Sequence, residues 1–249
     1  MARADVLFGI GEAAQGDILG RVVGVIDVLR ASTSIAVALA NGARAVIPCE
    51  ESEEAITRAK TFAKKEVILA GERRMHPIPG FDLGNSPGEF TREVVDGKTV
   101  VLTTTNGTAA IASTQGARDV VVASYVNYSA VLAMLRSALR GGNGVTLLCS
   151  GREKHFSLED AACAGRYVRG LARDLPGVEF NDAARASAVV ERRYADNIAL
   201  LFTDSEHGRA LEEAGYGGDL VTCAAVDSCP VVPIYHDRQI TKLGPEREW

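Results

Sequence analysis

The fold class is indicated first by residues 22–32, which read Val22-Val23-Gly24-Val25-Ile26-Asp27-Val28-Leu29-Arg30-Ala31-Ser32. The β-branched run from Val22 to Val28 is typical of a buried strand, and a helix is predicted directly after it, from about Thr33 to Ala40. Asn41-Gly42 then ends that helix. Because apolar strands and helices keep alternating along the chain, we expect a three-layer α/β/α fold whose largely parallel or mixed sheet is covered on both faces.

The remaining predicted elements follow the same alternation. Further strands are expected at residues 6–10, 43–48, 67–70, 99–103, 120–123, 145–149, 220–226 and 231–234. Helices are expected at residues 51–64, 109–114, 130–139 and 158–171, followed by a mostly helical stretch up to about residue 213. Cys229-Pro230 and Val232-Pro233 place the last strand at an edge, because proline cannot donate to a ladder. We expect a single domain over residues 1–249, in which the more helical part from about residue 175 could form a subdomain.

Composition narrows the class of protein. The 249 residues are 47% hydrophobic, and their net charge of −5 gives no general attraction to nucleic acid or to acidic membranes. The five cysteines lack CxxC spacing, so we interpret them as small core residues of a protein from a reducing compartment. We expect a cytoplasmic enzyme without a targeting segment or a membrane span, and a small homo-oligomer from the frequency of such assemblies.

Charged residues follow the first strand at a position where α/β proteins bind ligands. Ligands of open α/β sheets lie beyond the carboxyl ends of the strands. Asp27 is therefore a candidate catalytic residue and ligand of a hard cation, and Arg30 a candidate for gripping an oxyanion. Ser32 is a candidate substrate-binding hydroxyl. The structural alternatives are an Asp27–Arg30 ion pair and a helix cap at Ser32 or Thr33.

A similar group, Gly71-Glu72-Arg73-Arg74, follows the predicted strand at residues 67–70. Glu72 is a candidate metal ligand or general base. Arg73 is a candidate for binding substrate, whereas we expect Arg74 to be solvated.

The segment from Glu72 to Glu89 is rich in proline, glycine and charge, and we interpret it as an ordered functional loop. Within it, Asp82, Asn85 and Ser86 lie between turn-forming residues, and Asn85 is a candidate for orienting a ligand. An Asx-type turn is the structural alternative, and it is stronger for Ser86 than for Asn85.

The turn at Thr103–Thr108 joins an apolar strand to a helix of small residues. Free amides at a helix N-terminus bind anions, and glycine lets the backbone approach a ligand closely. We predict a phosphate cradle formed by Thr104, Thr105, Asn106, Gly107 and Thr108. An ordinary helix cap is the alternative.

A last segment, Ser157-Leu158-Glu159-Asp160, follows the strand at residues 145–149. Its Ser-x-x-Asp pattern predicts a capped helix start, and the adjacent acids Glu159 and Asp160 also suit magnesium. The four histidines are scattered in the sequence, which argues against a histidine-based zinc site. Phosphate-binding GxxxxGK[ST] and the GxSxG and HExxH motifs are absent from the sequence.

Taken together, these segments resemble the 2-phosphosulfolactate phosphatase (ComB) family in order and spacing along nearly the whole chain. The resemblance rests on Asp27-Val-Leu-Arg-Ala-Ser32, Gly71-Glu-Arg73, Gly80-Phe-Asp-Leu-Gly-Asn-Ser-Pro87, Thr103-Thr-Thr-Asn-Gly-Thr108 and Ser157-Leu-Glu-Asp160. The tail from Glu206-His207-Gly208 through Asp219 and Cys223 is also similar. Arg74-Met75-His76-Pro77 fills a stretch that we expect to vary, and with it the part of the substrate beyond its phosphate.

The resemblance implies a Mg²⁺-dependent hydrolase that converts 2-phospho-3-sulfolactate to 3-sulfolactate and phosphate in coenzyme M biosynthesis. Its expected partner is therefore a small phosphorylated sulfonate or carboxylate. Our hypothesis is metal-assisted hydrolysis, with Mg²⁺ bound by some of Asp27, Glu72, Glu159 and Asp160. The alternatives are a non-catalytic binder of small phosphorylated acids, a phosphatase for another organic phosphate, and a mutase or lyase. Direct attack by water and a covalent path through Asp27 or Ser32 both remain open at this point.

Overall fold

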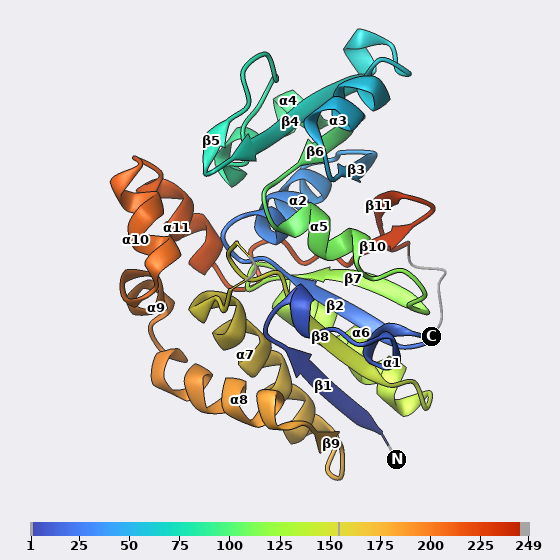
Figure 1. Ribbon diagram of the computed structural model, residues 1–249, viewed down its shortest axis with the longest axis vertical. Coiled ribbons are helices and arrows are strands. Elements are labelled where there is room, and N and C mark those ends of the chain that lie inside the picture. The colour runs from blue at the N-terminus through green and yellow to red at the C-terminus, as the bar shows by residue number, and fades with distance from the viewer. Residues whose placement is uncertain (1, 154, 245–249) are drawn as a thin grey trace.

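The computed structural model describes residues 2–153 and 155–244, and its strands form one mixed sheet with helices on both faces (Figure 1). The strands are β1 (Arg3–Leu7), β2 (Val22–Ile26), β3 (Ala45–Cys49), β4 (Val67–Arg73), β5 (His76–Pro77), β6 (Thr99–Thr103), β7 (Asp119–Ala123), β8 (Val145–Cys149), β9 (Glu179–Phe180), β10 (Pro233–His236) and β11 (Gln239–Lys242). The helices are α1 (Gln15–Ile18), α2 (Ala31–Ala40), α3 (Ser52–Ala59), α4 (Arg92–Val95), α5 (Gly107–Ala112), α6 (Tyr128–Arg140), α7 (Leu158–Asp174), α8 (Asp182–Tyr194), α9 (Ile198–Asp204), α10 (Glu206–Glu213) and α11 (Gly217–Ala224), with 3-10 turns η1 (Ile10–Glu12), η2 (Lys64–Glu66) and η3 (Pro87–Glu89).

The sheet consists of two parallel blocks that a hairpin joins. Its strand order is β5-β4-β6-β3-β11-β10-β7-β2-β8-β1-β9. The first block is β4, β6 and β3, and the second block is β7, β2, β8, β1 and β9; pairing is parallel within each. Hairpin β10–β11 pairs antiparallel with β3 on one side and with β7 on the other. Because all three of these pairings are antiparallel, the strands of one block run opposite to those of the other.

Helices α2 and α5 pack between the two blocks and share their core. Strand β2 shows the alternation of faces, since Val22 and Ile26 pack with α6 and α7, whereas Val23 and Val25 pack with α2 and α5. Both helices contact strands of each block. The blocks appear as separate groups of strands above and below these helices in Figure 1. The predicted three-layer α/β/α fold is confirmed.

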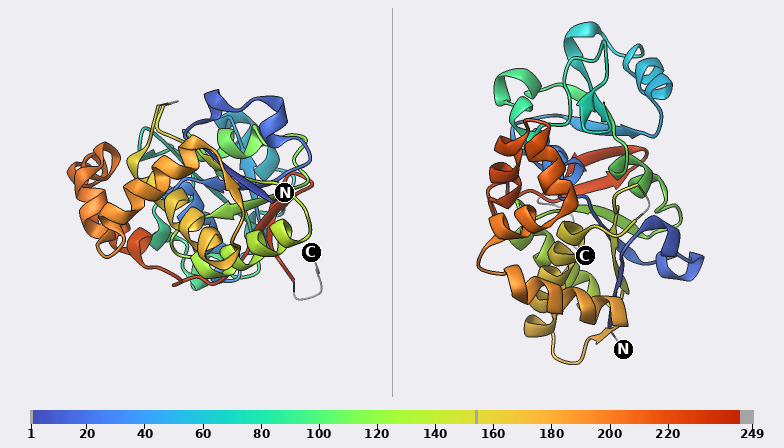
Figure 2. Two further views of the ribbon diagram at one scale, coloured as in Figure 1. Left: turned by 90° about the horizontal axis from the view of Figure 1, so that it is seen from below. Right: turned by 60° about the vertical axis from the view of Figure 1, so that its left-hand side comes forward.

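The C-terminal helices lie along one side of the molecule (Figure 2). Helices α8, α9 and α10 confirm the predicted helical character of this region, and α11 contacts turn η3 from a distant part of the sequence. The chain's last helices thus reach the segment between β4 and β6, close to the cavity described below.

Two predictions about the C-terminal part are wrong. Residues 220–226 were expected to be a strand but lie mainly in α11, because a short apolar run does not distinguish a strand from a half-buried helix. The last predicted strand, at residues 231–234, was expected at an edge, but the corresponding β10 lies inside the sheet. Pro230 precedes β10 and Pro233 is its first residue, so neither proline removes a hydrogen bond from the middle of the ladder.

The cysteines and the apolar segments agree with the composition. All five cysteines are free, and Cys49, Cys149, Cys163 and Cys223 are buried, which confirms their prediction as core residues. Across residues 2–153 and 155–244, no helix combines the length and the apolar character needed to cross a membrane.

Candidate active site

A cavity of about 230 Å³ lies where the two blocks approach each other near α2 and α5. Its wall is built from the turn after β2, the end of β4 with the following turn, Asn85, the turn between β6 and α5, the loop after β8 and the start of α10. Segments from both strand blocks and from the C-terminal helices therefore meet at one small polar space.

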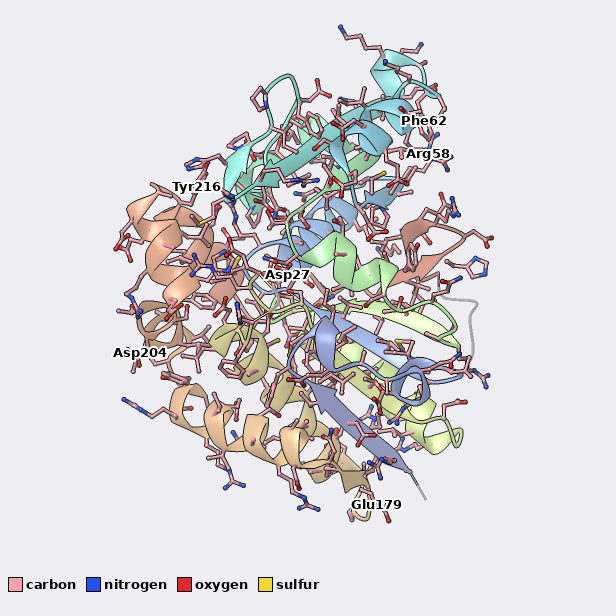
Figure 3. The ribbon with its side chains drawn as sticks, in the orientation of Figure 1. Asp27, Arg58, Phe62, Glu179, Asp204 and Tyr216 are labelled. Carbon is pink, nitrogen blue, oxygen red and sulfur yellow. The ribbon has the colours of Figure 1, made fainter. Side chains whose placement is uncertain are left out.

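Asp27 lies at the inner wall of this cavity, near the middle of the molecule (Figure 3). Its Oδ1 accepts a hydrogen bond from the Ala31 amide at 3.2 Å, and Gly107 packs so closely that an added Cβ would lie 2.7 Å from Oδ2. Burial and, to a smaller extent, the nearby Glu72 raise the pKa of Asp27 to about 6, against the opposing charge of His207 and the Ala31 hydrogen bond. A buried carboxylate with this pKa is a feature of functional sites.

Ser32, predicted to bind substrate, has a structural role in the observed fold. Its hydroxyl accepts a hydrogen bond from the Asp27 amide at 2.8 Å, and it is buried outside the cavity wall. Ser32 therefore fixes the backbone of Asp27. It does not cap α2, whose N-cap residue is Arg30 and makes no capping hydrogen bond through its side chain.

Arg30 forms its ion pair with the C-terminal part of the chain and not with Asp27. Its guanidinium donates to Asp219 at 2.8 Å and to the Met75 carbonyl at 2.8 Å, and it stacks 4.4 Å from the centre of the Tyr216 ring. The Ser86 hydroxyl also donates to Asp219. Figure 3 shows Tyr216 on the side where the C-terminal helices meet the β4–β5 hairpin. This network ties α11 to the cavity wall.

Glu72 connects two turns that border the cavity. The amide and hydroxyl of Thr105 donate to its two carboxylate oxygens, at 2.7 and 3.0 Å, and the Met75 amide donates at 2.8 Å. Arg74 and Met75 have φ values of 51° and 74°, in the left-handed region that costs an L-residue about 1–2 kcal/mol. Glu72 is thus both a wall of the cavity and the anchor that keeps this turn in its unusual conformation.

The Thr103–Thr108 turn is only partly available to a ligand. Thr104 and Thr108 bond to each other, each amide donating to the other's hydroxyl, and Thr105 serves Glu72. Thr104, Thr105 and Asn106 line the cavity, whereas Gly107 backs Asp27 and Thr108 borders a separate hollow. Of the predicted cradle, Thr104, Thr105 and Asn106 therefore face the cavity, whereas Gly107 and Thr108 make contacts within the protein.

Arg73 does not lie where it was predicted to bind substrate, whereas Arg74 is exposed as expected and also lines the cavity. Strand β4 extends to Arg73, so neighbouring side chains point to opposite faces. Arg73 donates to the carbonyls of Glu72 and Glu50 and to the Thr103 hydroxyl, and it does not line the cavity. Arg74 lies on the same side as Glu72 and does line it. A longer strand prediction would have revealed this alternation.

Asn85 carries a polar atom that lacks a partner. The residue is 4% exposed and lines the cavity, and its Oδ1 has no hydrogen bond within the described part of the chain. Buried polar atoms are nearly always paired, so this oxygen is available to a ligand or a cation. By contrast, Asp82 accepts from the Leu69 amide at 2.9 Å. This contact joins its loop to β4 and is not the local hydrogen bond of an Asx-type turn.

Glu159 and Asp160, predicted metal ligands, lie behind the cavity wall. Asp160 accepts from the amides of Val28 and Gly151 and from the Ser150 hydroxyl, and its pKa is raised by burial and by the charges of Asp27 and Glu159. The predicted cap is present, since the Asp160 amide donates to Ser157. Asp160 therefore supports the turn that carries Asp27.

His207 is a cavity residue that the sequence analysis did not single out. Its Nδ1 lies 3.2 Å from Glu159 Oε1. Burial alone would raise the pKa of Glu159, but the hydrogen bond and charge of His207 outweigh burial and lower it. His207, Asp219 and Tyr216 come from the last third of the chain. The only sequence signal for them was the resemblance of the tail containing Glu206-His207-Gly208 and Asp219.

The cavity's donor set suits a hard cation. No group of three or more His, Cys, Asp or Glu side chains is placed to hold a metal ion anywhere in residues 2–153 and 155–244. Mg²⁺, however, commonly takes only one or two carboxylates and completes its shell with water and substrate phosphate. Asp27, Glu72 and the unpartnered Asn85 Oδ1 are all oxygen donors on one cavity, so these residues fit such an ion.

Comparisons with known proteins identify the family to which the chain belongs. The profile of a family described as 2-phosphosulpholactate phosphatase matches residues 10–238. The chain is 40% identical over 227 residues to a "Probable 2-phosphosulfolactate phosphatase" of Symbiobacterium thermophilum, covering 91% of this chain and 96% of that protein. It is 33% identical over 241 residues to one so named from Clostridium botulinum, covering 97% and 100%. The chain is therefore a phosphatase, a hydrolase of phosphoric monoesters. It belongs to the 2-phosphosulpholactate phosphatase family.

Proposed function

We propose that this phosphatase hydrolyses 2-phosphosulfolactate to 3-sulfolactate and phosphate, and that it requires Mg²⁺. The observation that carries the proposal is the pair of buried carboxylates, Asp27 and Glu72, beside the unpartnered Asn85 oxygen in one small cavity. The cavity of about 230 Å³ suits a substrate with a three-carbon chain. The names of the relatives support the same substrate.

Asp27 and Glu72 would hold the ion, with Asn85 as a further oxygen donor. When bound, Mg²⁺ supplies Lewis-acid polarisation of the phosphoryl group and neutralises its charge. The two carboxylates repel each other, as the effect of Glu72 on the pKa of Asp27 indicates, so a cation at this place also relieves that repulsion.

The other residues would position the substrate. Thr104 and Asn106 present polar groups to the phosphoryl oxygens from the turn before α5, where free amides favour an anion. His207 has Nδ1 at Glu159, which leaves Nε2 free to donate a hydrogen bond to the leaving oxygen of the ester. Arg30 fixes the wall and not the phosphate, since its guanidinium already bonds to Asp219 and Met75.

A non-catalytic binder of phosphorylated acids is the weaker alternative. Two carboxylates beside an anion site would repel the ligand unless a cation lies between them. The cavity contains these carboxylates, which favours hydrolysis.

Phosphate release from 2-phosphosulfolactate tests the proposal. We expect turnover with Mg²⁺, none with EDTA, and at least about a thousandfold lower kcat in Asp27→Asn. Arg44→Ala, an exposed substitution at the start of β3, should leave turnover unchanged and is the control. Absence of release from this and from simple phosphoesters would exclude a phosphatase acting on them, and release that EDTA does not reduce would exclude the metal.

A further inference from the structure

Two arginines border the mouth of the cavity, and their guanidinium groups make few contacts with the described part of the chain. Arg74 comes from the turn after β4, and Arg152 from the loop after β8. The Arg74 side chain is exposed, and its guanidinium has no hydrogen bond or ion pair within residues 2–153 and 155–244. Arg152 forms one long ion pair: its Nη1 lies 3.9 Å from Oε2 of Glu206, whose side chain is 85% exposed and therefore holds the guanidinium only weakly.

The backbone that carries each arginine is nevertheless fixed. The Arg74 amide donates to the Thr105 hydroxyl at 3.2 Å, and the adjacent Met75 is held through both its amide and its carbonyl. Arg74 keeps a left-handed conformation that glycine would adopt more easily. The turn therefore places a guanidinium at the mouth at a conformational cost, and no contact inside the protein uses that guanidinium.

The backbone of Arg152 is held by its contacts with His155. Arg152 and His155 exchange two backbone hydrogen bonds, at 3.0 and 2.9 Å. A Cβ on Gly151 would lie 2.3 Å from the His155 carbonyl oxygen, so the backbones of residues 151 and 155 approach closely next to the arginine. Its position at the mouth is thus a property of the backbone, as it is for Arg74.

Arg30 and Arg73 differ from this pair in their chemistry. Arg30 is bound by Asp219, the Met75 carbonyl and the Tyr216 ring, and Arg73 is bound by two carbonyls and a hydroxyl. Their donors are directed at the protein, whereas those of Arg74 and Arg152 remain for a ligand. Guanidinium groups bind planar or trigonal oxyanions through two parallel hydrogen bonds.

We propose that Arg74 and Arg152 bind the second anionic group of the substrate, a sulfonate or carboxylate on its carbon chain. These contacts determine the substrate specificity of the enzyme. This proposal rests on the proposed function, because the phosphoryl group must lie at the inner wall near Asp27 and Glu72. An anion carried on the same short chain would then point to the mouth, where the two guanidinium groups lie. Simple phosphoesters lack that group and would bind without these contacts.

A comparison of three substrates tests the proposal. 2-Phosphosulfolactate carries both anions, 2-phospholactate carries only the carboxylate, and isopropyl phosphate has a similar ester bond but neither anion. For Arg74→Ala with Arg152→Ala, we expect the ratio of kcat/KM for 2-phosphosulfolactate over isopropyl phosphate to fall about a hundredfold, mainly through KM. Each single substitution should lower it about tenfold. A matching fall for 2-phospholactate would assign the contact to the carboxylate, and a fall for 2-phosphosulfolactate alone would assign it to the sulfonate.

Binding measured without turnover separates the two proposals. Calorimetry with 3-sulfolactate should show at least about tenfold weaker binding to the double variant than to the unaltered protein. The matched control is Arg44→Ala, which removes an exposed arginine far from the cavity and should change neither the ratio nor the affinity. An unchanged ratio together with unchanged 3-sulfolactate affinity would overturn the role of the arginines even if the protein is a phosphatase. Weaker 3-sulfolactate binding without any turnover by the unaltered protein would overturn the proposed function alone.

Discussion

The inner wall and the mouth of the cavity use charged residues in opposite ways. At the inner wall, Arg30, Asp219 and Glu72 are buried, and each has protein partners for its polar atoms. At the mouth, backbone hydrogen bonds hold Arg74 and Arg152 in place. The Arg74 guanidinium has no partner within the described residues, and that of Arg152 has only the exposed Glu206, 3.9 Å away. The difference teaches that buried, fully paired charges at this site are the ones that shape it, whereas exposed charges that are unpaired or only weakly paired at its opening are the ones available to a ligand.

The two classes of arginine should differ most in their effect on stability. Arg30→Met leaves Asp219 buried without its cation, so we expect a loss of about 3 to 5 kcal/mol in the free energy of unfolding. Arg74→Met removes no contact and should change stability by less than about 0.5 kcal/mol. Urea unfolding of the two variants measures the difference. Equal losses in the free energy of unfolding would show that the arginines of the wall and of the mouth contribute equally to stability.

Asp27 sharpens the comparison because it is a wall residue whose charge is not fully compensated. Its pKa of about 6 exceeds the ordinary 3.8, so the folded protein binds the proton more tightly than the unfolded chain does. The stability that this proton contributes is complete below about pH 4, falls as pH rises to about 6 and stays lost above it. In EDTA at pH 8, Asp27→Asn should therefore be more stable than the unaltered protein by up to about 3 kcal/mol.

The same two proteins should have similar stability at pH 4, since Asp27 is then protonated in the folded state. Thermal unfolding across this pH range provides the measurement. A stabilisation that is equally large at pH 4 and at pH 8 would show that the charge of Asp27 is not its cause.

Gly107 tests whether the wall depends on close backbone packing. A Cβ at this position would lie 2.5 Å from the Ala31 Cβ and 2.7 Å from Asp27 Oδ2, so either α5 or the Asp27 carboxylate must move. We expect Gly107→Ala to lower kcat/KM about tenfold, since small displacements of a positioned group reduce catalysis strongly. Gly16→Ala is the matched control, because a Cβ there meets no atom within 4 Å. Equal activity of the two variants would separate Gly107 from the chemistry.

Local patterns were sufficient for most of the fold but not for the order of the late strands. Strands β2, β6 and β8 and helices α2, α6 and α7 follow from apolar runs, helical periodicity and end signals that act within a few residues. The insertion of hairpin β10–β11 between two parallel blocks depends on which open edges are left to pair after β3 and β7 have formed. Such pairing is not encoded in the residues of the hairpin alone.

The candidate site divides in the same way. Asp27, Glu72, Asn85 and Thr104 were predicted from polar residues at strand ends, and the structure places all four on one cavity. His207 and Asp219 have no such local pattern. His207 lines the cavity and Asp219 pairs with the cavity residue Arg30, and both come from helices that pack there only in the folded chain. Arg73 was predicted to face the ligand in place of Arg74 because the predicted strand ended three residues before β4 does.

By itself the sequence determined the α/β class, the strand-end residues and, through several uncommon motifs, membership of a phosphatase family. Only the tertiary structure decided which charges are paired inside the wall and which remain at the mouth. The physical reason is that the partners of Arg30, Glu72 and Glu159 come from segments distant in the chain, and hydrogen bonding acts over a few ångströms in space.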